Sequence, residues 1–264
     1  MERAAALGQG KPGVAEWIAS QESLALAYSG HLQQARKMSR HAADLAQRPG
    51  RRETAALFYA GAAVREAFFE NAAEARRSAM RALELSQGRD VEYGVSLALA
   101  RVGDSSQSQR LANDLEKRFP EDSEVRFAYL PVLHALLALH HSEPARAVEL
   151  LEIAVPYELG VPLCFTFGFF GSLYPVYVRG EGYLAAHQGA AAVAEFQKIL
   201  DHRGIVISDP IGALVHLQLG RAFVLSGDKG KAKAAYEDFL TVWKDADPDI
   251  PILKQAKAEY ARLK

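Results

Sequence analysis

The feature that most constrains this chain is a pattern of small and aromatic residues that occurs twice between Tyr177 and Trp243. The later copy reads Leu219-Gly220-x2-Phe223 followed by Ala232-x3-Tyr236, and the earlier one reads Gly180-x2-Tyr183 followed by Ala192-x3-Phe196. In both copies the alanine stands nine positions after the aromatic residue. Self-similarity of this kind indicates a chain built from repeated supersecondary units.

The residue types in the pattern predict two closely packed antiparallel helices. Leu219, Gly220 and Phe223 share one stripe of a first helix. Ala232 and Tyr236 begin a matching stripe on a second helix. A glycine inside a helix costs roughly 0.5–1 kcal/mol relative to alanine, so Gly220 indicates that the two helices approach closely. The alternative interpretation is an ordinary amphipathic helical hairpin.

Small, aromatic and turn positions that agree in two copies are typical of the tetratricopeptide repeat, a unit of about 34 residues. We therefore predict an all-α fold, a right-handed superhelical solenoid of about six such hairpins with a C-terminal capping helix. The predicted hairpins are 16–47, 52–86, 91–119, 124–155, 173–204 and 211–244, and the capping helix is 250–264. Residues 1–264 form one solenoid in this interpretation, in which residues 1–13 are the end of a preceding helix and a loop.

The segment 156–172 interrupts the repeats with an aromatic, glycine-bearing insertion. Two interpretations stay open. The insertion either folds into the core between repeats, or it forms a lip over the groove or a patch for self-association.

Composition excludes several classes of function. The formal net charge is −1, so we predict no nucleic-acid partner and no strong attraction to an anionic membrane. The most apolar stretch, 161–178, contains Pro162, Gly168, Gly171 and Pro175, so direct membrane insertion is not expected. The single cysteine, Cys164, excludes an internal disulfide.

A more specific resemblance is carried by the stretches GQGKPGVAEWIA, AVPYELG, LYPVYVRGEGYLAA, EFQKILDHRGIV and WKDADPDIPILKQAKAEYARL. These resemble the C-terminal tetratricopeptide region of bacterial proteins that carry an N-terminal serine/threonine kinase domain or a winged-helix DNA-binding domain. The resemblance covers nearly the whole chain and implies the sensory or docking part of a larger signalling protein. It implies a cytoplasmic location, with an extracytoplasmic part of a membrane-anchored parent as the alternative.

No catalytic machinery is expected in this chain. The kinase motifs are missing, since there is no glycine-rich phosphate loop, His-Arg-Asp or Asp-Phe-Gly sequence. His134 and His141 are seven positions apart and could share a helix face, but no third ligand stands near them. Asp245, Asp247 and Asp249 begin like a calcium loop, which Pro248 interrupts. We predict no enzyme activity, cofactor or bound metal.

The remaining candidate site is the concave surface, which the first helix of each repeat lines in this family. The predicted protein-binding groove consists of Trp17, Gln21, Leu24, Tyr28, Val64, Phe68, Tyr93, Leu97, Arg101, Tyr129, Leu136, His140, Tyr174, Tyr177, Glu181, Leu217 and Arg221. These residues are mostly apolar or aromatic, which favours an apolar peptide segment over a terminal carboxylate as the ligand. In the alternative interpretation, about half of them pack between repeats.

The predicted function is therefore a protein–protein interaction module that holds a protein or peptide in its groove. The alternative is a self-association module that dimerises the parent through the aromatic insertion, so a homo-oligomer is a possible assembly.

Overall fold

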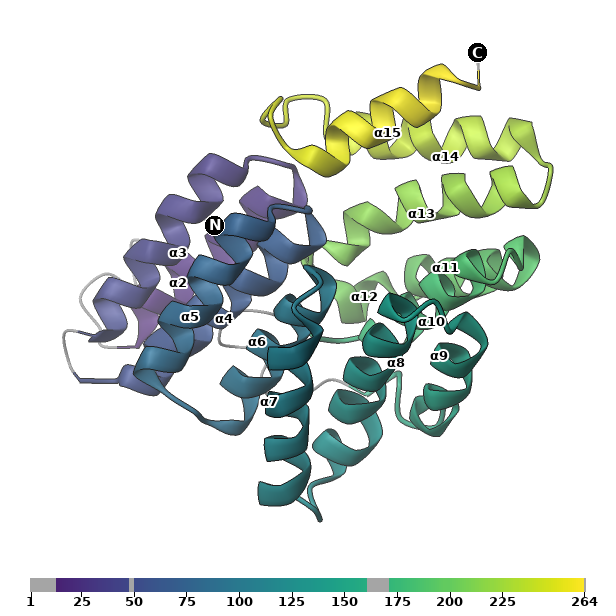
Figure 1. The fold of residues 1–264 in the computed structure, drawn as a ribbon. Coiled ribbons are helices and arrows are strands. Elements are labelled where there is room, and N and C mark those ends of the chain that lie inside the picture. The colour runs from purple at the N-terminus through teal and green to yellow at the C-terminus, as the bar shows by residue number, and fades with distance from the viewer. Residues whose placement is uncertain (1–12, 48–49, 161–170, 264) are drawn as a thin grey trace.

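The computed structural model describes residues 13–47, 50–160 and 171–263, and every regular element among them is helical (Figure 1). The all-α prediction is confirmed. The longer helices are α2 (Val14–Tyr28), α3 (Leu32–Gln47), α4 (Arg52–Phe68), α5 (Ala72–Leu85), α6 (Arg89–Arg101), α7 (Ser105–Arg118), α8 (Leu130–His140), α9 (Pro144–Leu150), α10 (Tyr174–Ala185), α11 (Gly189–Asp201), α13 (Ile211–Leu225), α14 (Lys229–Val242) and α15 (Pro251–Ala261). Short elements are a π-helical turn at Val125–Tyr129, a 3-10 turn at Glu152–Ala154 and α12 (Arg203–Val206).

Each helical hairpin turns through one residue in the left-handed region. The turn residues are Gly30, Glu70, Gly103, Ser142, His187 and Gly227, with φ between 57° and 81°. Each stands five positions before a small residue of the second helix: Ala35, Ala75, Ser108, Ala147, Ala192 or Ala232. Glycine reaches this conformation without steric cost, so the turns at Gly30, Gly103 and Gly227 are the less strained ones.

Aspartate caps fix where some second helices begin. The Asp228 carboxylate accepts a hydrogen bond from the Lys231 backbone N–H at 3.0 Å, and Asp104 accepts one from Gln107 at 3.3 Å. Each cap satisfies a backbone donor that the first helical turn leaves unpaired. The turn residue and the aspartate cap that follows it together define where α14 and α7 begin.

The glycines of the two clear repeats lie where the aromatic pattern requires them. A Cβ added at Gly220 would lie 2.7 Å from the Tyr236 ring, and one added at Gly180 would lie 2.5 Å from the Phe196 ring. Both distances are too short for a real carbon contact, so these positions admit only glycine without movement of the ring. The mid-helix glycines therefore serve the close packing that their sequence pattern predicts.

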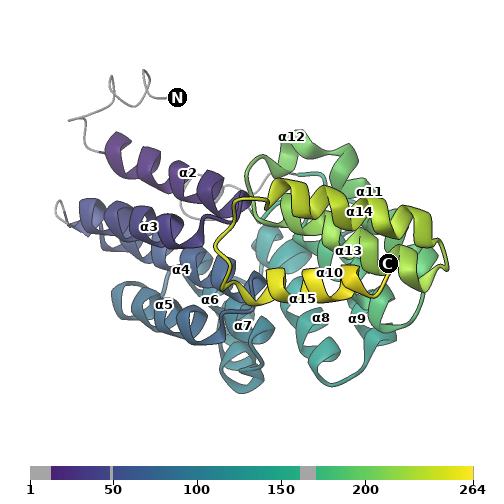
Figure 2. The same cartoon turned by 90° about the horizontal axis from the view of Figure 1, so that it is seen from above.

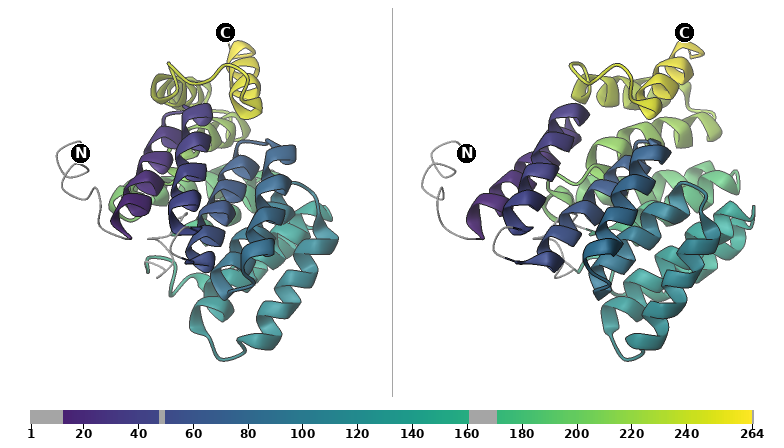
Figure 3. Two further views of the ribbon diagram at one scale, coloured as in Figure 1. Left: turned by 90° about the vertical axis from the view of Figure 1, so that its left-hand side faces the viewer. Right: turned by 60° about the vertical axis from the view of Figure 1, so that its left-hand side comes forward.

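The solenoid curls until its two ends meet. The Trp243 indole N–H donates to the Tyr28 carbonyl oxygen at 2.9 Å, and the Asp247 N–H donates to the Gly30 carbonyl oxygen at 3.0 Å. The Asp247 carboxylate accepts from the Gln33 N–H at 2.7 Å. Figures 2 and 3 show the loop before α15 reaching the end of the α2–α3 hairpin. The last repeat thus packs against the first.

Two predicted segments fall largely outside the described residues. These are the N-terminal segment, of which only Gly13 is described, and the insertion 156–172, of which 161–170 are not described. Within the described part of the chain, no helix has both the length and the apolar character needed to cross a membrane.

Candidate functional site

Most of the predicted groove residues lie in the core. Ten of the seventeen are at most 8% exposed: Leu24, Val64, Phe68, Tyr93, Leu97, Tyr129, Leu136, Tyr174, Tyr177 and Leu217. The curl of the solenoid presses the first helices together, so that Phe68 meets the rings of Tyr174 and Tyr177 at centroid distances of 5.3 and 5.5 Å. Tyr93 and Tyr129 stack on each other. Buried side chains of this kind stabilise the solenoid and offer no surface to a peptide.

The rest of the predicted set is divided between two places. Trp17 is exposed on α2, where Gln21 is half-buried, and Tyr28 lies at the closure of the solenoid. Arg101, His140, Glu181 and Arg221 keep accessible surface, and together with the edge of Leu136 they line one open cleft. The structure therefore brings five of the predicted residues together.

The cleft has a volume of about 670 Å³ and lies at the C-terminal ends of α6, α8, α10 and α13. Its remaining lining residues are Ala100, Leu139, Leu184, Ala185, Gln218 and Gln255. Leu139, Leu184 and Ala185 give it an apolar side, while Gln218 and Gln255 supply amide groups. This mixture of apolar surface and a few directional polar groups is typical of ligand-binding concavities of this size.

Arg101 is held rigidly at one side of the cleft. Its guanidinium donates two hydrogen bonds to the Glu181 carboxylate, at 2.8 and 2.9 Å, and lies over the Phe68 ring at 4.2 Å. Burial lowers the pKa of Arg101, but the Glu181 carboxylate outweighs it, so the pKa is raised and the charge is retained. The fork-shaped pair fixes both side chains in one geometry.

Arg221 forms the same kind of pair, and Gln218 bonds both this arginine and Glu181. Arg221 donates to the two carboxylate oxygens of Glu259 on α15 at 2.8 and 2.9 Å, and the Tyr236 hydroxyl donates to the same carboxylate at 2.7 Å. Burial raises the pKa of Glu259, but the hydrogen bonds and charge of Arg221, together with the Tyr236 hydroxyl, outweigh burial and leave the pKa lowered. The α15 helix is thereby tied to the cleft.

The charge balance limits what the cleft can recognise. Arg101 and Arg221 are each neutralised by a glutamate, and the described lining residues include no further lysine or arginine. A terminal carboxylate needs unpaired cationic donors, which this lining does not provide. Uncharged polar contacts through the exposed His140 and Gln255, beside the apolar side, suit a neutral peptide segment better.

Several lining residues were not predicted from the sequence. Gln218 stands three positions before Arg221 on the same helix, so helical spacing could have identified it. Leu139, Leu184 and Ala185 stand next to or close to predicted residues in the sequence. Gln255 carried no such signal, because it belongs to the predicted capping helix and reaches the cleft only through the packing of α15.

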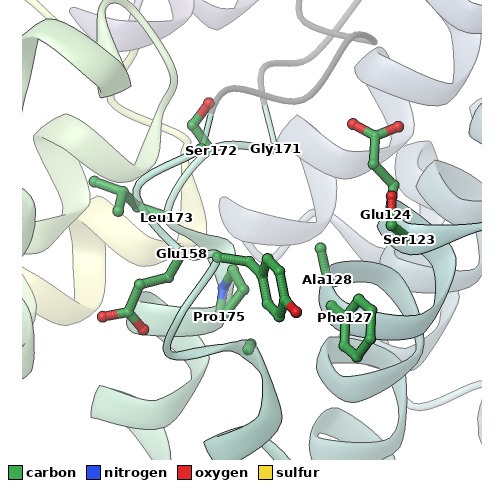
Figure 4. A pocket seen from close by; sticks show the side chains of 12 residues that line it. Ser123, Glu124, Phe127, Ala128, Glu158, Gly171, Ser172, Leu173 and Pro175 are labelled. Atoms are coloured by element: carbon green, nitrogen blue, oxygen red, sulfur yellow. The ribbon is translucent and has the colours of Figure 1, made fainter.

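A smaller cavity of about 210 Å³ lies beside the insertion. Figure 4 shows Phe127 and Ala128 on one side of it, and Leu173 and Pro175 on the other. The Phe127 ring stacks on Tyr157 at a centroid distance of 4.5 Å. The described lining of this cavity is mostly apolar.

No group that could hold a metal is formed by three or more histidine, cysteine, aspartate or glutamate side chains within the described ranges. His140 lines the cleft, whereas His134 and His141, the pair expected to share a helix face, together line a separate surface hollow.

The fold is similar to that of a tetratricopeptide repeat protein from Parabacteroides merdae, known from a crystal structure. The two structures superpose with a TM-score of 0.55 at 10% sequence identity, over 98% of this chain and 89% of the other. The likeness shows a tetratricopeptide-like solenoid. No family model matches the sequence, and no curated protein matches it.

Proposed function

We propose that this protein is a non-catalytic scaffold that holds a peptide segment of another protein in the cleft between α6, α8, α10, α13 and α15. The observation that carries the proposal is the gathering of five predicted groove residues around one cleft of about 670 Å³. Two rigid arginine–glutamate pairs frame it, so a peptide would meet preorganised walls and lose less entropy on binding.

The proposed ligand is a largely apolar, uncharged segment. Leu139 and Leu184 would cover its apolar side chains, while the exposed His140 and Gln255 would bond its backbone. That the chain is the docking part of a larger bacterial signalling protein, such as a serine/threonine kinase, is proposed on the sequence resemblance alone.

The test is a peptide selection from a random library on the purified chain, followed by calorimetric titration of the selected peptides. Arg101→Glu and Tyr177→Ala are unsuitable as probes, because both residues help to hold the core together. The exposed Ala185 lines the cleft, so Ala185→Arg should block it and weaken binding by at least about tenfold.

The matched control is Ala194→Arg, an exposed alanine on the neighbouring α11 that does not line the cleft. It should bind like the wild-type chain. If both variants lose affinity equally, or if Ala185→Arg leaves the affinity unchanged, the peptide binds at another surface of the molecule.

A second candidate, self-association, is favoured by one observation. Ile153, Val155, Tyr157 and Leu159 are each about half exposed within a single short segment that leads into the insertion and includes its first residues. Exposed apolar side chains gathered in this way are typical of interaction surfaces. Sedimentation equilibrium should then show dimers that Tyr157→Asp dissociates, whereas a chain that stays monomeric up to about millimolar concentration excludes this role.

A further inference from the structure

A separate cavity of about 410 Å³ lies away from the cleft, between α3 and α5 with α4 beside both. Side chains from these three helices line it, and its most frequent residue is arginine. The arginines are Arg36, Arg40, Arg65, Arg77 and Arg81. Ser39, Ser78 and Tyr59 add three hydroxyl groups. Guanidinium groups and hydroxyls together form the donor set that proteins use to bind oxyanions.

The acidic side chains of the cavity do not balance its arginines. Three glutamates line it, and each pairs with one arginine: Arg36 with Glu66, Arg77 with Glu74 and Arg81 with Glu84, all at 2.7 Å. Within the described residues, no ion pair with a carboxylate is formed by Arg40 or Arg65. The cavity therefore keeps two positive charges that no carboxylate of the described residues pairs with.

Arg65 is the more unusual of the two, because it is buried. Only 2% of it is exposed, yet it lines the cavity. Its Nη1 donates to the Ser23 hydroxyl at 2.8 Å, while its Nε and Nη2 find no acceptor among the described residues. Burial lowers the pKa of this guanidinium, and Glu66 opposes the shift. A buried cation with unused donors is costly unless an anion accompanies it.

A serine pair extends the donor set toward α3. The Ser23 hydroxyl that accepts from Arg65 also lies 2.7 Å from the hydroxyl of Ser39, which lines the cavity. Arg65, Ser23 and Ser39 thus form one hydrogen-bonded chain from the core to the cavity wall. This chain holds the guanidinium in place before any ligand binds.

We propose that this cavity binds a phosphate monoester, with Arg65 and Arg40 as the principal charge partners. Two unpaired arginines match the charge of a phosphate monoester, which is close to −2 at neutral pH, better than that of a single carboxylate. The flat guanidinium fork can also bond two phosphate oxygens at once. The volume exceeds what a phosphate ion fills, which leaves space for the group that carries it.

The test is calorimetric titration of the full chain with inorganic phosphate and with a short serine–glycine peptide containing one phosphoserine. The unphosphorylated peptide serves as the ligand control. We expect saturable one-to-one binding of at least one phosphate probe and none of the unphosphorylated peptide. Similar affinity for both probes would identify a free phosphate as the source, and at least tenfold tighter binding of the phosphopeptide would identify a protein-borne ester.

Three variants assign the binding to the cavity. Arg40→Gln changes an exposed side chain and should weaken binding by about tenfold or more while leaving the melting temperature in place. Arg65→Met should abolish binding. Arg110→Gln, an exposed arginine of α7 outside the cavity, should bind like the wild-type chain.

Two outcomes would overturn the proposal. One is the absence of saturable binding for either phosphate probe at millimolar concentration. The other is binding that Arg40→Gln leaves unchanged, and this result overturns the proposal even when Arg65→Met fails to fold.

Discussion

The N-terminal and C-terminal hairpins solve the same packing problem with different side chains. In α10–α11 and α13–α14, a glycine of the first helix faces an aromatic ring of the second, as Gly180 faces Phe196 and Gly220 faces Tyr236. In α2–α3 the equivalent positions are Ser23 and Ser39, whose hydroxyls lie 2.7 Å apart. Large and small residues are paired at one end of the molecule, and small polar residues are paired at the other.

This difference explains why the repeat is visible only in part of the sequence. A glycine opposite an aromatic ring leaves a distinctive pattern, whereas serine and alanine are common throughout the chain. In α6–α7 the seam, meaning the contact between the two helices of a hairpin, is again polar. The buried Ser96 hydroxyl bonds the backbone oxygen and the hydroxyl of Ser108, both at 3.0 Å. The glycine–aromatic seam depends on shape, and the serine seam depends on hydrogen bonds, so the two should respond differently to substitution.

The largest effect is expected where the two regions meet. Trp243 is 1% exposed, packs its ring against Phe69 and Phe239, and donates to the Tyr28 carbonyl. Trp243→Ala should therefore lower the free energy of unfolding by about 3–5 kcal/mol, measured by urea denaturation followed by circular dichroism. Trp17→Ala, at an exposed tryptophan, should change it by at most about 0.5 kcal/mol. A loss under about 1 kcal/mol at Trp243 would mean that the two ends of the solenoid barely stabilise each other.

The next effect tests the shape-dependent seam. Gly220→Leu introduces a side chain whose Cβ alone would lie 2.7 Å from the Tyr236 ring, so it should cost at least about 1–3 kcal/mol through overpacking. The melting temperature reports the loss. Gly204→Ala, where an added Cβ meets nothing within 4 Å, is the matched control and should be neutral or slightly stabilising. An unchanged melting temperature in Gly220→Leu would refute the close packing of this seam.

A pH effect tests a buried charge in the N-terminal region. Burial raises the pKa of Glu92 on α6 to about 7, although Arg118 at 2.9 Å opposes the shift. The folded pKa thus lies above the unfolded one, so the protonated form stabilises the fold below about pH 4.5, and this stability is lost as the pH rises through 7. Glu92→Gln cannot ionise, so its stability relative to the wild-type chain should increase by about 1–3 kcal/mol between pH 4 and pH 8. Urea denaturation at both pH values measures it, and a difference independent of pH would contradict the raised pKa.

The smallest effect tests the hydrogen-bonded seam. Ser96→Ala removes two hydrogen bonds in α6–α7 and should cost about 0.5–1.5 kcal/mol, because Ser108 keeps a buried hydroxyl without that partner. Ser96→Ala combined with Ser108→Ala removes both hydroxyls and should cost less than the single change. The free energy of unfolding is measured for both single variants and for the double variant. A double variant whose loss equals the sum of the two single losses would show that the hydroxyls act independently.

The candidate site shows where prediction from the sequence was limited. Helical spacing assigned Arg101, Glu181 and Arg221 each to a face of its own first helix, and the packing of α6, α10 and α13 brings the three residues to one cleft. The same reasoning put Tyr177 and Phe68 on such faces, where the structure buries them. Whether such a face is an open groove or a filled core depends on the angles between successive hairpins, which no single repeat specifies.

The sequence by itself determined the helical hairpins, since glycine–aromatic spacing, turn residues and aspartate caps act over a few positions of the chain. Only the tertiary structure decided that the solenoid closes, with Trp243 of the last repeat and Asp247 of the loop before α15 bonded to the first repeat. It also decided that Gln255 completes a cleft and that Arg65 is buried without a carboxylate partner among the described residues. The physical reason is that curvature accumulates over many interfaces, each set by the side chains of two helices far apart in the sequence.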